Sequence, residues 1–64
     1  MSALLNKRNR ILNLLDLIMQ ERYILAAQMD KLVYHNNTSN GAYDKCALRR
    51  TQLANRFKLL YNCL

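Results

Sequence analysis

The feature that most constrains the fold is the run from about Ser2 to His35, which contains neither glycine nor proline. Its apolar residues recur at the spacing of a helix rather than that of a strand. A helix with so wide an apolar stripe must be covered by something else. We therefore expect one long helix over residues 2–35, with two apolar columns spaced by seven residues: Leu4, Ile11, Ile18, Leu25 and Leu32, beside Leu5, Leu12, Met19, Ala26 and Val33.

The next six residues, 36–41, carry no apolar side chain and are expected to form a loop in which Asn36 or Asn37 closes the first helix. Residues 42–62 again place apolar side chains at steps of three and four, which predicts a second helix capped by Ser39 or Asn40. A short loop makes consecutive helices antiparallel neighbours. The expected fold class is all-α: residues 1–64 form one antiparallel two-helix hairpin, completed by self-association or by a partner protein.

The chain has 64 residues, which is near the lower limit for independent folding, so it needs a further source of stability. Cys46 and Cys63 on one helix would lie roughly 25 Å apart, too far for a disulfide, so we expect free thiols. His35 is the only histidine, and with two distant cysteines it cannot form a zinc site. We expect no metal and no cofactor, and association remains as the source of stability.

The first helix is longer than the second, so residues before about Asn13 are expected to extend beyond it. Arg8 and Arg22 interrupt the apolar face. Either each reaches a carboxylate on a partner, or its stem lies along the seam while the guanidinium reaches water. The candidate partner-binding residues comprise the overhang, the seam and these two arginines: Leu4, Leu5, Arg8, Ile11, Leu12, Ile18, Arg22 and Leu25.

The net charge of +6 is concentrated in the second helix, where the only acid is Asp44. A basic stripe can contact phosphates, although it is commonly a solvated face. The alternative function is therefore a homodimeric four-helix bundle that binds RNA, like plasmid copy-number regulators of the Rop type. Its candidate nucleic-acid-binding residues are Lys45, Arg49 and Arg56.

The sequence does not contain the residues that several other classes of function require. No serine, cysteine or acid stands at a recognisable catalytic spacing from His35, and Gly41 is the only glycine, which leaves no phosphate-binding loop. No stretch approaches the roughly 18 apolar residues of a membrane span, and we expect no secretory signal. We expect a cytoplasmic, non-enzymatic protein–protein interaction module.

The order of elements from about Ala26 onward resembles that of a known family. Residues 28–32 close a helix, the loop 37–41 follows, then Tyr43, and residues 52–61 form part of a second amphipathic helix. This layout is similar to that of the short co-chaperones of type III secretion needle subunits, which are helical hairpins of about this size. The resemblance implies a bacterial cytoplasmic hairpin that packs against a helical-repeat chaperone and helps to keep a needle subunit unpolymerised. It assigns no individual contact residue.

Overall fold

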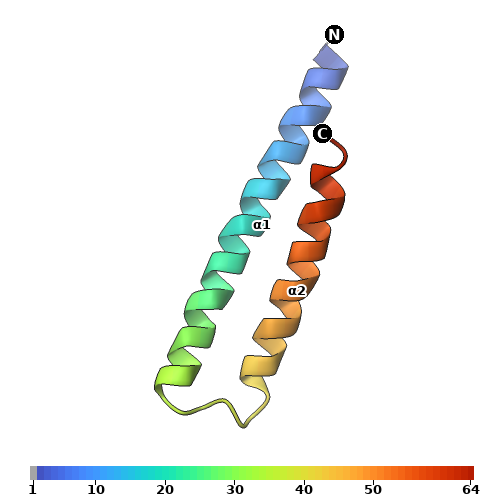
Figure 1. Cartoon of the computed structure of the whole chain (residues 1–64). Coiled ribbons are helices and arrows are strands. Elements are labelled where there is room, and N and C mark those ends of the chain that lie inside the picture. The colour runs from blue at the N-terminus through green and yellow to red at the C-terminus, as the bar shows by residue number, and fades with distance from the viewer. Residues whose placement is uncertain (1) are drawn as a thin grey trace.

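The computed structural model describes residues 2–64 and consists of two antiparallel helices, α1 (Ser2–Tyr34) and α2 (Ala42–Tyr61). They lie side by side in a rod of 53 × 15 × 11 Å, and the loop joins them at one end (Figure 1). No strand occurs within residues 2–64. The prediction of an all-α, antiparallel hairpin is confirmed.

The end of α1 is fixed by backbone hydrogen bonds in the loop. The N–H of Asn37 donates to the carbonyl of Leu32 at 2.8 Å, and the N–H of Asn36 donates to that of Val33 at 3.0 Å. Asn36 adopts a left-handed conformation with φ 53°, as a residue that closes a helix in this way must. The prediction of an asparagine closing the first helix is therefore confirmed at Asn36.

The start of α2 differs in detail from the prediction. Gly41 occupies the N-cap position with φ 84° and makes no side-chain cap. Asn40, one residue before the N-cap, supplies a side-chain acceptor at the start of α2: its Oδ1 accepts a hydrogen bond from the N–H of Ala42 at 3.1 Å. The chain thus enters α2 through a glycine in the left-handed conformation, which L-residues adopt at a cost.

The hairpin core is a thin seam between the helices. Ile11, Leu15 and Ile18 of α1 are buried, and Leu53 of α2 is the most buried of all, with 2% of its surface exposed. Because a single neighbouring helix covers only one stripe of α1, the predicted column that includes Leu12 stays largely open. Packing within the hairpin therefore leaves much of the apolar surface of α1 uncovered.

The prediction that Ile11 extends beyond the second helix is wrong, since its side chain is only 7% exposed. The chain continues past α2 in a turn, where Cys63 and Leu64 donate backbone hydrogen bonds to the carbonyls of Leu60 and Tyr61. This turn brings Leu64 alongside Ile11. The overhang is correspondingly shorter, and the N-terminal turns of α1 extend past the end of the chain in Figure 1.

Candidate partner-binding surface

An open groove of about 560 Å³ lies at the end of the hairpin opposite the loop, between the first turns of α1 and the last residues of the chain. Leu4 is 79% exposed and Leu5 is 58% exposed, so both present most of their apolar surface to solvent. Two basic side chains stand among the apolar ones. The lining residues are Leu4, Leu5, Lys7, Arg8, Ile11, Cys63 and Leu64.

The open-end groove combines four apolar side chains with two basic ones. Protein interfaces likewise combine apolar contact surface with polar side chains. Arg8 lies on the groove and is exposed, so its guanidinium is free to meet a carboxylate from outside. The groove is therefore suited to receive one or two large apolar side chains next to an acid.

Exposed apolar residues continue along both flanks of α1 beyond the groove. Leu12 and Met19, one heptad apart, lie on one flank, and Leu14, Leu17 and Ile24 lie on the other. Each of these five side chains has more than two-fifths of its surface exposed. Apolar surface exposed over several turns of a helix indicates an interaction site.

Three of the predicted partner-binding residues contribute to the seam of the hairpin. Ile11 and Ile18 are buried, and Leu25 is half-buried. Ile18 shares a depression with Leu53 of α2, which shows what covers it. A partner that leaves the hairpin intact can therefore contact Leu4, Leu5, Arg8 and Leu12, and it meets Ile11 where that residue lines the groove.

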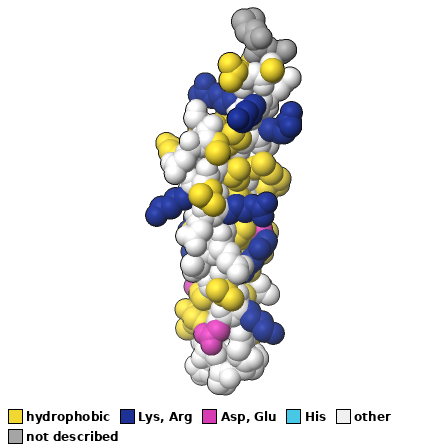
Figure 2. All heavy atoms as spheres, turned by 90° about the vertical axis from the view of Figure 1, so that its right-hand side faces the viewer, with side chains coloured by type: hydrophobic (Ala, Val, Ile, Leu, Met, Phe, Trp, Pro, Cys, Tyr) yellow, Lys and Arg dark blue, Asp and Glu magenta, His cyan; other side chains and the backbone are white. Residues whose placement is uncertain are grey.

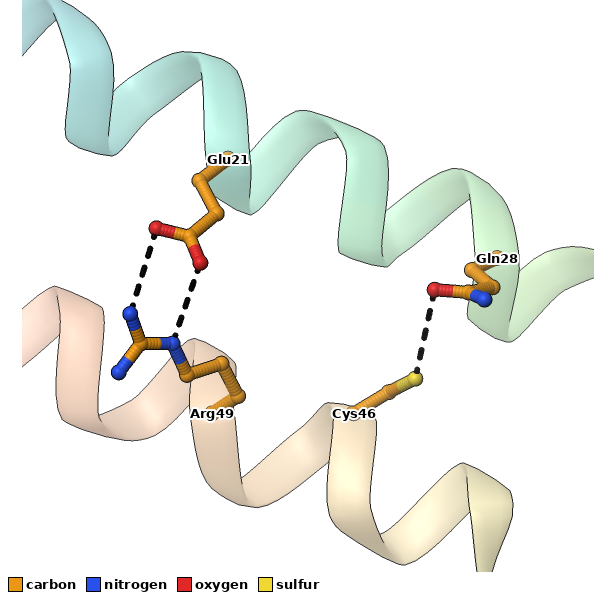
Figure 3. Close-up of polar contacts among 4 residues, drawn as sticks. All are labelled: Glu21, Gln28, Cys46 and Arg49. Carbon is orange, nitrogen blue, oxygen red and sulfur yellow. Dashed lines mark hydrogen bonds and ion pairs between the residues drawn. The ribbon is translucent and has the colours of Figure 1, made fainter.

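A pair of residues that sequence reasoning missed joins the two helices. The Nε of Arg49 donates to one carboxylate oxygen of Glu21 at 3.2 Å, and its second terminal nitrogen donates to the other oxygen at 3.5 Å (Figure 3). Nearer the loop, the thiol of Cys46 lies 3.8 Å from Oε1 of Gln28. The opposite charges of Glu21 and Arg49 were visible in the sequence, but their pairing depends on the register between the helices.

The three residues proposed for RNA binding differ in their side-chain contacts. Lys45 and Arg56 are exposed, whereas the guanidinium of Arg49 is engaged with Glu21. On the face that Figure 2 shows, Lys and Arg side chains are interspersed with apolar ones, and the few carboxylates lie in the half toward the loop. The basic side chains on this face are separated from one another and form no continuous track.

Arg22 matches neither of the two predicted arrangements completely. It is half-buried, and its Nε is buried with no hydrogen-bond partner within the described residues. One terminal nitrogen lies 3.9 Å from the sulfur of Met19. Arg50 of α2 has the same environment, with a buried, unpartnered Nε and a terminal nitrogen 3.9 Å from the sulfur of Met29. Sequence reasoning did not single out Arg50.

Neither metal-site geometry nor a membrane span is present among residues 2–64. No three His, Cys, Asp or Glu side chains gather there, and Cys46 and Cys63 are free thiols. Neither helix has the length and apolar character needed to cross a bilayer. Comparison of the chain with protein-family models, with curated proteins and with solved structures gave no match.

Proposed function

We propose that this protein is a non-enzymatic interaction module that binds an amphipathic helix of another protein. The binding surface is the open-end groove together with the flank of α1 that carries Leu12 and Met19. The observation that carries the proposal is the exposure of Leu4 and Leu5 in a groove that Leu64 helps to form. A helix laid into an apolar groove is a common mode of protein recognition.

The mechanism is mutual burial of apolar surface. Covering a large apolar side chain stabilises a complex by roughly 1.5 to 3 kcal/mol, so Leu4 and Leu5 alone provide a substantial driving force. A chain of 64 residues with a seam this thin gains folding stability from the same contact. Binding and completion of the fold are then one process.

We further propose, on the layout shared with co-chaperones of type III secretion needle subunits, that the partner is a chaperone or subunit of a secretion apparatus and that the complex forms in the cytoplasm. In that role the hairpin would shield apolar helix surface that otherwise aggregates. RNA binding has weaker support, because Glu21 occupies the guanidinium of Arg49 in the middle of the basic stripe.

Site-specific photocrosslinking in the native host tests the proposal. A photoreactive amino acid at Leu5 should give a discrete crosslinked species of higher mass, while the same label at Asn55, exposed on the far side of α2, should not. The substitution Leu4→Ser, with Ile24 unchanged, should abolish the crosslink because it makes the groove more polar. Equal labelling from Leu5 and Asn55, or none from either, would rule out the groove as the binding surface.

A further inference from the structure

The two sides of the seam differ in their charge balance. Neighbouring residues on a helix point about 100° apart, so Glu21 and Arg22 diverge to opposite sides of the seam, as Arg49 and Arg50 do on α2. On one side the acid Glu21 meets the base Arg49. On the other side Arg22 and Arg50 line one shallow depression of about 270 Å³. Two positive charges and no acid line that depression.

No carboxylate of the described chain neutralises this arginine pair. The only ion pair within residues 2–64 is that between Glu21 and Arg49. The depression is completed by uncharged side chains. Within residues 2–64, one terminal nitrogen of each arginine makes a hydrogen bond, and its acceptor is a methionine sulfur, which is a weak acceptor. A buried Nε without an acceptor is a cost to the folded state, and Arg22 and Arg50 each have one. The arrangement therefore lacks an anion.

We propose that the arginine pair, Arg22 and Arg50, is a clamp for a side-chain carboxylate on the helix of a partner protein. This inference rests on the proposed function and specifies the chemistry of the partner. Arginine presents several N–H donors in a plane that matches a carboxylate. Arg22 and Arg50 would hold one acid by turning both guanidinium groups from the methionine sulfurs into the depression that they share.

The surroundings of the clamp fit a helix rather than a nucleic acid. Ala47 and Ala54 border the depression, and their small side chains allow another helix to approach closely. Met19, which contacts Arg22, is about half exposed and offers apolar surface next to the charge. A sugar–phosphate backbone would leave this apolar surface unused, whereas an amphipathic helix would cover it.

The overall charge favours an acidic partner over a second copy of the chain. Each copy carries +6, and ten bases stand against four acids, of which Glu21 is already paired. Association of two copies would bring like charges together, whereas an acidic helix would reduce the net charge of the complex.

A selection from a library of helical peptides tests the clamp. The library carries an apolar stripe with one turn randomised at its centre, and it is selected on the full chain and on the double variant Arg22→Met, Arg50→Met. Methionine preserves the length and apolar character of the arginine stem. Arg56→Met is the matched control, because Arg56 is exposed and lies outside the depression.

Peptides selected on the natural chain should carry Glu or Asp at the centre and bind about ten-fold more tightly than their Gln or Asn counterparts. The preference should persist with Arg56→Met and vanish with the double variant, which should be at least as helical as the natural chain. The clamp is refuted if no peptide binds or if the binders show no acidic preference. It is also refuted if the double variant keeps that preference or loses helicity. Loss of dimerisation, or of binding to a labelled single-stranded RNA, in the double variant would refute it as well, because the arginines would then serve a different partner. Binders without acidic preference would sink the clamp alone, whereas the photocrosslinking result at Leu5 decides the proposed function.

Discussion

Arg49 of α2 reaches across the seam to Glu21 of α1 with its Nε 3.2 Å from the carboxylate oxygen. This is the one ion pair between the helices in the described chain, and it uses both carboxylate oxygens. It contributes to the register between the two helices. It also removes one charge from the basic stripe of α2, which leaves Lys45 and Arg56 separated by a neutralised position.

The contribution of this pair to stability should be small. The side chains are 48% and 46% exposed, and ion pairs at such exposure contribute at most about 1 kcal/mol. A double-mutant cycle with Glu21→Gln and Arg49→Met, measured by urea unfolding in a constant concentration of trimethylamine N-oxide, should give a coupling energy below about 1 kcal/mol that falls with added salt. A large coupling that is insensitive to salt would disagree with the observed exposure.

Leu53→Ala should disrupt the hairpin. Leu53 is the most buried side chain, and truncating such a leucine costs about 2 to 5 kcal/mol, a large part of the stability of a small domain. Circular dichroism of the variant should show loss of most helical signal. Leu48→Ala is the control, because Leu48 lies on the exposed surface of α2 and its truncation should change stability by less than about 0.5 kcal/mol. Similar losses in the two variants would mean that the seam does not hold the helices together.

Gly41→Ala should weaken the entry into α2 by about 1 kcal/mol, because alanine is disfavoured at a positive φ. No atom lies within 4 Å of a Cβ placed there, so backbone conformation rather than a clash is the cause. Gly41→Asn should cost less, since asparagine tolerates the left-handed region. The urea midpoints of the two variants check this ordering, and a smaller loss with alanine than with asparagine would show that the turn has another conformation.

Local patterns were sufficient to predict the helices and the loop. Helical spacing of apolar residues identified both helices, and the polar run before Gly41 identified the loop, because these are properties of neighbouring residues. The relation between the helices depends on how side chains interdigitate. Ile11 was expected to be uncovered because the expected pairing of the two helices left residues before about Asn13 without a neighbour, whereas the structure places Leu64 beside Ile11.

The charged residues of the seam likewise could be predicted only where neighbouring residues in the sequence were sufficient. Arg22 was singled out because it interrupts an apolar column. Arg50 was not, since it lies among other bases and its significance appears only when it shares a depression with Arg22. The pairing of Glu21 with Arg49 likewise requires the register, which composition and spacing do not determine.

The central claim is that the hairpin alone leaves too much apolar surface exposed and is completed by association. Thermal melting of the purified chain, followed by helical circular dichroism over a wide dilution series with the molecular mass measured by sedimentation, tests it most directly. We predict a partly helical monomer with a broad transition, which gains helicity and melts more sharply only when it associates. A monomer that melts sharply and cooperatively at every concentration would contradict the claim.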